Sequence, residues 1–177
     1  MIEDKIKRKL RSIVDFPRKG VIFRDITPIL QDPQLCSEIL EEMILSLRKI
    51  EFDVVAGVES RGLLFGFLLA SRLQKPFIMI RKEGKLPFDK LSQEYNLEYG
   101  KTSIEIHADS IEKGQRVLIH DDLLATGGTV SAATQLVNKL GGIVSAFSFI
   151  VELDYLGGRE NLKKATPNII SLVRYQE

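Results

Sequence analysis

The sequence predicts an α/β protein built on a mostly parallel β-sheet with helices on its faces. Two observations lead to this prediction. Short apolar runs alternate with segments of helical period, and a glycine-rich turn joins one apolar run to the helix after it. Strands separated by helices pair in parallel, and the crossover helices cover the sheet. Ligands of such sheets bind beyond the carboxyl ends of the strands, where loops lead into helices.

The predicted strands are short apolar runs, as is typical of strands buried on both faces. His120 closes the third of them, at a position where another aliphatic residue would be expected. The five runs span residues 53–58, 77–80, 117–120, 143–151 and 168–173.

The predicted helices carry apolar residues at helical spacing. Asp32 and Pro33 form an N-cap followed by a first-turn proline and so open one of them. Two further helices span residues 61–73 and 129–140. The buried face of the helix after Asp32 and Pro33 is predicted to carry Leu35, Ile39, Met43 and Leu47, and a short N-terminal helix is predicted from Ile2, Ile6, Leu10 and Ile13.

Residues 82–100 form a polar stretch without a clear period. A loop of this length is unusual in a compact domain and is typical of an active-site lid or of a disordered segment. We therefore expect a flexible lid loop here.

Composition sets limits on the function. The 177 residues are 44% hydrophobic and 28% charged, as in an ordinary globular chain of one domain, here residues 1–177. A formal net charge of +1 gives no reason to expect nucleic acid or a membrane as a partner. Cys36 is the single cysteine, which excludes an intrachain disulfide. The charged N-terminal segment and the short apolar stretch 62–70 indicate a soluble, cytoplasmic protein.

The turn Ala125, Thr126, Gly127, Gly128 and Thr129 lies where a phosphate would bind. Glycines let the backbone approach a ligand closely, and the N-terminus of the following helix attracts an anion. The turn is not a Walker A loop, because no lysine follows its glycines.

Two adjacent acids, Asp121 and Asp122, precede this turn, although carboxylates repel a phosphate. A 5-phosphorylated ribose resolves the conflict, because its vicinal hydroxyls lie about one sugar length from its phosphate. Carboxylates accept hydrogen bonds from hydroxyls and can help to hold a divalent cation, directly or through water. The alternative is a solvated acidic strand end beside a helix entry that binds nothing. The two motifs, in this order after a buried strand, favour the ribose phosphate.

These motifs resemble those of the type I phosphoribosyltransferases, and the resemblance extends over nearly the whole chain. It is closest to the members of the family that use adenine. The segments that carry it are FPRKGVIFRDITPIL (16–30), VAGVESRG (55–62), IRKEGKLP (80–87), YNLEYG (95–100), VLIHDDLLATGGT (117–129) and VELDYLGGRE (151–160).

The resemblance implies a function. The protein would transfer the 5-phosphoribosyl group from 5-phosphoribosyl 1-diphosphate to adenine, with Mg²⁺ as cofactor, giving AMP and diphosphate. It also implies a homodimer, a hood for the base at about residues 1–33, and a lid at about residues 82–100.

The resemblance further implies which residues bind the diphosphate end of the substrate. Successive N–H groups of the loop after residue 58, with the Arg61 guanidinium, suit a diphosphate. Arg81 and its neighbours would reach a partner subunit's site. As surface-loop lysines, Lys82 and Lys85 are equally consistent with simple solvation. The full set implied is Glu59, Ser60, Arg61, Arg81, Lys82, Lys85 and Tyr99.

For the base and the chemistry, the resemblance implies that Glu98 and Arg61 are catalytic, with Glu98 handling the purine proton. Periodicity alone places Phe23 in the core, whereas the resemblance places it on the face of the base. The residues implied to bind adenine are Ile22, Phe23, Arg24 and Leu153.

Two other functions stay open on the sequence. One is a phosphoribosyltransferase for another base, such as xanthine, orotate or a 6-oxopurine. The other is a regulatory protein that only senses phosphoribosyl diphosphate. Such a sensor would be expected to carry a DNA-binding segment, for which the chain leaves little room.

Overall fold

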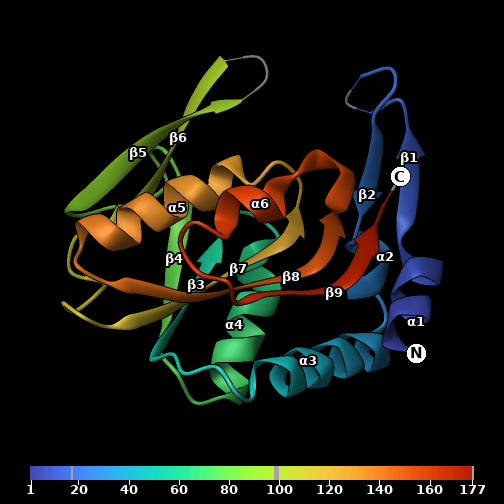
Figure 1. The fold of residues 1–177 in the computed structure, drawn as a ribbon, viewed down its shortest axis with the longest axis horizontal. Coiled ribbons are helices and arrows are strands. Elements are labelled where there is room, and N and C mark those ends of the chain that lie inside the picture. Colours follow the sequence, from blue (N-terminus) through green and yellow to red (C-terminus); the bar gives the residue numbers. More distant parts are fainter. Residues whose placement is uncertain (17, 98–99, 177) are drawn as a thin grey trace.

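A seven-stranded sheet organises the chain in the computed structural model, which describes residues 1–16, 18–97 and 100–176. Its strand order is β5-β6-β4-β3-β7-β8-β9, and the last five strands in this order run parallel (Figure 1). The predicted α/β fold with a mostly parallel sheet is therefore confirmed. The strands are β3 (Val54–Val58), β4 (Phe77–Lys82), β5 (Lys90–Leu97), β6 (Gly100–His107), β7 (Arg116–Leu124), β8 (Ile143–Leu153) and β9 (Ile169–Tyr175).

Helices cover both faces of this sheet (Figure 1). One face carries α5 (Gly128–Lys139) and α6 (Gly158–Leu162), the latter preceded by the 3₁₀ turn η1 (Asp154–Leu156). The other face carries α1 (Ile2–Lys9), α2 (Thr27–Leu30), α3 (Pro33–Leu47) and α4 (Gly62–Arg72). No helix in the described part of the chain is long and apolar enough to cross a membrane.

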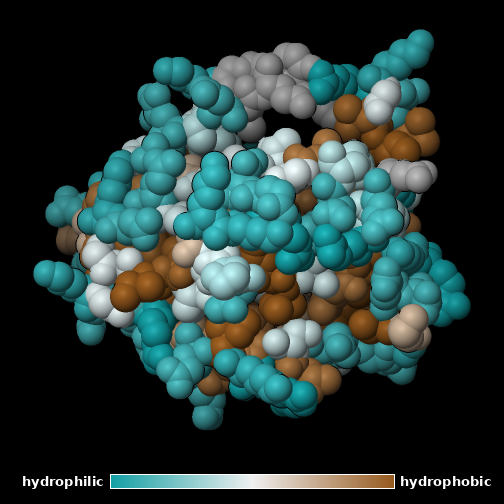
Figure 2. Space-filling view, in the orientation of Figure 1, coloured by the Kyte–Doolittle hydropathy of each residue, from teal (hydrophilic) through white to brown (hydrophobic). Residues whose placement is uncertain are grey.

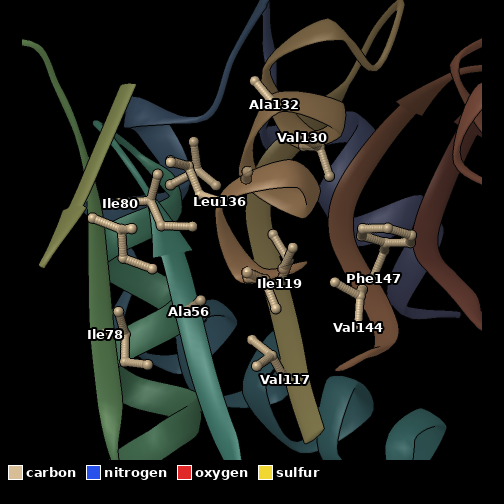
Figure 3. Packing of buried hydrophobic residues seen from close by; sticks show 14 of the residues in the cluster. Ala56, Ile78, Ile80, Val117, Ile119, Val130, Ala132, Leu136, Val144 and Phe147 are labelled. Carbon is tan, nitrogen blue, oxygen red and sulfur yellow. The ribbon is translucent and has the colours of Figure 1, made fainter. Parts of the chain in front are cut away.

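Two apolar clusters, one on each face, hold the layers together. Figure 3 shows the cluster between the sheet and α5, where Ile119 of β7 lies against Val130 and Leu136 of the helix. The second cluster packs α3 and α4 against the sheet and includes Leu118 and Phe65. Each fully buried aliphatic side chain stabilises the fold by roughly 1.5–3 kcal/mol relative to an exposed one.

A separate two-stranded sheet lies above one end of the main sheet (Figure 1). It consists of β1 (Arg11–Val14) and β2 (Ile22–Asp25), which pair antiparallel. Apolar residues gather over it, at the upper right of Figure 2. The β5–β6 hairpin rises at the opposite side of the same end, so the carboxyl ends of the central strands lie between the two (Figure 1).

Three predictions of local structure were wrong. The N-terminal helix ends at Lys9, because Leu10 is extended with ψ at 137°, and Ile13 pairs with Phe23 in β1–β2. The strand predicted at 117–120 continues to Leu124, so the paired acids lie inside it. Much of the stretch predicted as a lid loop forms β5, which pairs with β6 residue by residue from Lys90–His107 to Leu97–Gly100.

Candidate functional site

A cavity of about 340 Å³ lies at the carboxyl ends of β3, β4 and β7. Parallel strands bring their carboxyl ends to one edge of the sheet, which explains why segments far apart in sequence meet there. The residues around the cavity are Glu59, Ser60, Arg61, Lys82, Tyr95, Thr102, Asp121, Asp122, Leu123 and Thr129. Seven of these ten were predicted as site residues, and Tyr95, Thr102 and Leu123 were not.

Asp121 and Asp122 both line the cavity. The Asp122 side chain is buried and accepts a hydrogen bond of 2.6 Å from Nε of Arg61. The charge of Asp122 is thus compensated from within the site. The pKa of Asp121 is raised, mainly by burial and to a lesser extent by repulsion from the carboxylate of Asp122. A hydroxyl donor or a cation beside Asp121 would relieve both effects.

The loop between β3 and α4 holds Arg61 over the acids. The Glu59–Ser60 peptide bond is cis, and α4 begins at Gly62. A Cβ atom on Gly62 would lie 2.8 Å from Oδ1 of Asp121 and 2.9 Å from the carbonyl oxygen of His120. Glycine is therefore required at this position for the helix start to approach β7 so closely.

Of the cations of β4 and the loop after it that were predicted to bind diphosphate, only Lys82 lines the cavity. Arg81 donates from Nε to Glu59 over 3.1 Å, and the Lys82 backbone N–H donates to the same carboxylate over 2.9 Å. Although burial opposes it, these bonds lower the pKa of Glu59. Lys82 lines the cavity, whereas Lys85 is exposed and its carbonyl accepts from Arg81. Arg81 and Glu59 thus pair within one subunit.

The phosphate loop, residues 125–129, joins β7 to α5. Gly127 caps the helix with φ at +80°, a left-handed conformation that favours glycine, and α5 starts at Gly128. A Cβ atom on Gly128 would point towards β5, 3.8 Å from the carbonyl oxygen of Asn96 and from Cδ2 of Tyr95. The free N–H groups of the first helical turn favour an anion in this space.

The β1–β2 sheet supplies the predicted base site. Ile22 is exposed, and Phe23 is half-buried beside Phe16, with ring centroids 5.3 Å apart. The Arg61 guanidinium carbon lies 5.4 Å from the Phe23 ring centroid. The core position that periodicity indicates for Phe23 is therefore wrong, because β2 belongs to a two-stranded sheet outside the main one.

Arg24 and Leu153, the other two residues predicted to bind adenine, are both engaged in contacts within the protein. The Arg24 guanidinium carbon lies 4.0 Å from the Tyr175 ring, and Tyr175 pairs with Leu153 across β8 and β9. Leu153 is only 7% exposed, so little of its side chain is available to a ligand in this structure. Glu98 and Tyr99, predicted to act in catalysis and substrate binding, lie outside the described residues.

Tyr95 and Thr102 are site residues that sequence reasoning missed. They are cross-strand partners in the β5–β6 hairpin and both line the cavity. A weak signal was present, because Leu91, Tyr95 and Leu97 are separated by even numbers of residues, as on one face of a strand. The described residues contain no cluster of three or more acidic, histidine or cysteine side chains arranged to hold a metal.

Together, the fold and the site define a phosphoribosyltransferase. The family model of the phosphoribosyl transferase domain matches residues 25–164, and the chain belongs to this family. The adenine phosphoribosyltransferase of Methanococcus vannielii is 51% identical over 97% of this chain and 98% of its own length. That of Cytophaga hutchinsonii is 47% identical over 99% and 97%.

Solved structures agree with these relatives. The adenine phosphoribosyltransferase of Thermoanaerobacter pseudethanolicus has a TM-score of 0.94 and 48% identity, covering 99% of this chain and 100% of its own. The Saccharomyces cerevisiae enzyme, solved with adenine and an imino-altritol bisphosphate, has a TM-score of 0.88 and 34% identity, with coverage of 97% and 98%.

Proposed function

We infer that this chain is an adenine phosphoribosyltransferase, which joins adenine to 5-phosphoribosyl 1-diphosphate and releases AMP and diphosphate. The observation that carries the inference is the cavity in which Arg61, Asp121 and Thr129 meet. It offers a cation, hydroxyl acceptors and a helix N-terminus around one cavity of about 340 Å³. Relatives about half identical over the full length, all adenine phosphoribosyltransferases, support the choice of base.

The site must stabilise the leaving diphosphate, the developing positive charge on the sugar and the 5-phosphate. Departure of the diphosphate leaves an oxocarbenium-like centre at the sugar, as in glycoside cleavage. Arg61 and Lys82 stabilise the leaving diphosphate from one side of the cavity, and the Asp121 carboxylate accepts hydrogen bonds from the ribose hydroxyls. The phosphate loop holds the 5-phosphate. We propose that the β5–β6 hairpin, with Tyr95 and Thr102, closes over the sugar and excludes water.

Mg²⁺ is the proposed cofactor. The chemistry of the cavity fits such a cation, because the half-buried carboxyl of Asp121 lines it and repulsion from Asp122 contributes to the raised pKa of Asp121. Bound there with the substrate, Mg²⁺ would neutralise charge on the diphosphate. Asp121 and Asp122 are the residues that would help to hold it, directly or through water.

Adenine is proposed to bind along the outer edge of β2. One edge of β2 pairs with β1, and among the described residues no strand pairs with the other. A free strand edge presents N–H and C=O groups side by side, which complement the N1 acceptor and the 6-amino donor of adenine. Phe23 then covers one face of the base, and Leu153 the other after a local rearrangement.

A homodimer is proposed from an apolar surface formed by α4 and β4. Leu64, Phe67, Leu68 and Met79 on this surface are each between 43% and 57% exposed. A second copy of the chain is the proposed occupant, since a two-fold axis would pair the surface with itself. Arg81 lies two residues after Met79 on the same strand, so a partner subunit bound to this surface would lie close to the site. The cytoplasmic location stays a prediction.

The test is base selectivity. Hypoxanthine carries an acceptor at position 6 and a donor at N1, so it meets two like-facing pairs along β2. Each buried mismatch costs roughly 1–3 kcal/mol, which gives on the order of 10²–10⁴-fold discrimination. We expect diphosphate release with Mg²⁺ to be far more efficient with adenine than with hypoxanthine, xanthine or orotate.

The alternatives give different results in the same assay. Equal efficiency with adenine and hypoxanthine would contradict the choice of base and indicate a phosphoribosyltransferase of broader base specificity. Binding of phosphoribosyl diphosphate without turnover of any base would instead favour the sensor.

A further inference from the structure

The phosphate loop is supported from behind by α6. A Cβ atom on Gly158 would lie 2.2 Å from the carbonyl oxygen of Ala125, so only glycine allows this contact. The side-chain amide of Asn161 donates over 3.1 Å to the carbonyl oxygen of Thr126. Two successive carbonyl groups of the loop therefore face α6.

This arrangement determines where the loop's N–H groups point. In a trans peptide, the C=O of one residue and the N–H of the next are antiparallel. Carbonyl groups of Ala125 and Thr126 that face α6 leave the N–H groups of Thr126 and Gly127 facing the other way. Away from α6, a Cβ atom on Gly128 would lie 3.8 Å from Tyr95, and Tyr95 and Thr129 both line the cavity.

An ion pair between the half-buried Arg159 and the buried Glu152 holds α6 in place. Arg159 donates from Nε and Nη2 to the two carboxylate oxygens of Glu152, over 2.8 and 2.6 Å. Its Nη1 donates over 3.0 Å to the carbonyl oxygen of Ile169. The Glu152 side chain is 1% exposed and also accepts from Ser171 over 2.6 Å. A paired arginine and glutamate of this kind tie α6 to β8 and β9 with defined geometry.

We propose that Gly158 and Asn161 are positioning residues for the phosphate loop, held by the ion pair of Arg159 and Glu152. They turn the loop's N–H groups towards the 5-phosphate without contacting the substrate. This inference rests on the proposed function, because it assigns the 5-phosphate to residues 125–129.

The experiment compares two adjacent glycines. In Gly158→Ala the new methyl group pushes on the Ala125 carbonyl and rotates the loop. Gly157→Ala is the matched control, since its φ of +70° strains an alanine but nothing lies within 4 Å of the added atom. We expect Gly158→Ala to raise the KM for phosphoribosyl diphosphate roughly tenfold or more, as for loss of one or more good hydrogen bonds. The KM for adenine should change little. Gly157→Ala should lower Tm but keep both KM values.

Asn161→Ala provides a second variant, because Asn161 is exposed and its loss should leave the fold intact. We expect a smaller rise in the KM for phosphoribosyl diphosphate, roughly threefold to tenfold. Calorimetric binding of ribose 5-phosphate should weaken in parallel in both variants, and this readout does not need turnover.

The outcomes separate the two inferences. Unchanged ribose 5-phosphate affinity in folded Gly158→Ala and Asn161→Ala would overturn the positioning role. Equal increases in the KM for phosphoribosyl diphosphate and in the KM for adenine would also overturn it, since they would indicate general damage to the site. A wild-type protein that binds ribose 5-phosphate but does not turn over adenine would instead contradict the proposed function alone.

Discussion

His120 is a histidine in the core of β7. It is fully buried, and its Nδ1 lies 2.9 Å from Oγ of Ser148 on the neighbouring strand. Nε2 has no hydrogen-bond partner among the described residues. Burial lowers the pKa of His120 to about 4, so the folded protein keeps the ring neutral. The aliphatic residue expected at this position would have carried no such cost.

This burial predicts a loss of stability in acid. The unfolded histidine has a pKa of about 6.5 and takes up a proton that the folded state excludes until about pH 4. The contribution of His120 is therefore complete above pH 6.5 and falls by about 3 kcal/mol as the pH drops to 4. The double variant His120→Val with Ser148→Ala should lose less free energy of unfolding over this range. Denaturant titrations at several pH values would measure it, and parallel curves for the two proteins would contradict the prediction.

Single residues of the site were predictable where a local motif places them. Asp121 and Asp122 lie near the carboxyl end of a buried strand, Thr129 lies in the first turn of the next helix, and all three line the cavity. Their partners were not predictable in the same way. The bond between Arg61 and Asp122 joins residues 61 positions apart, and only the pairing of β3 with β7 brings them together.

At the scale of elements, a substitution at the start of α5 tests whether the phosphate loop binds the 5-phosphate. A Cβ atom on Gly128 meets nothing closer than 3.8 Å, so the backbone at this position accepts an added side chain, and we expect Gly128→Val to fold. The new side chain would nevertheless occupy the space between the loop and β5, where the 5-phosphate is proposed to bind. We expect Tm to stay near that of the wild type and phosphoribosyl-diphosphate affinity to be lost.

Calorimetry and thermal denaturation would measure the two quantities. Gln135→Val is a suitable control, because Gln135 is exposed further along the same helix. Wild-type affinity in folded Gly128→Val would remove residues 125–129 from the site.

The β5–β6 hairpin shows where reasoning by element failed. Its many polar residues suggested a loop, although Leu91 and Tyr95, and likewise Ile104 and Ile106, are spaced as on one face of a strand. A two-stranded hairpin is marginal alone. Here β6 pairs with β4, and Ile104 and Ile106 are buried in the core beside α5. Tertiary contacts thus make a hairpin of a segment whose local signal is weak.

At the scale of the molecule, the proposed dimer depends on the apolar surface of α4 and β4. Phe67 is the most exposed of its four residues, at 57%, and makes an edge contact with Phe77. Phe67→Asp would place a charge in the interface, where burial without a partner costs several kcal/mol. We expect sedimentation to show a dimer for the wild type and a monomer for Phe67→Asp.

Leu45→Asp is the matched control, since Leu45 is 50% exposed on α3, away from this surface. It should remain dimeric. A monomeric wild type at micromolar concentration, or a dimeric Phe67→Asp, would show that another partner or none covers the surface.

The sequence by itself determined the sheet class, the buried strand that carries the two acids, and the glycine-rich turn and helix that follow it. Periodicity and turn chemistry act over a few residues, so a single chain segment contains all the information they need. Tertiary structure alone decided that Glu59 pairs with Arg81, that Tyr95 joins the cavity and that Gly158 supports the phosphate loop. These contacts depend on which strands become neighbours. That order follows from burying two apolar faces at once, a property of the whole chain and not of any segment.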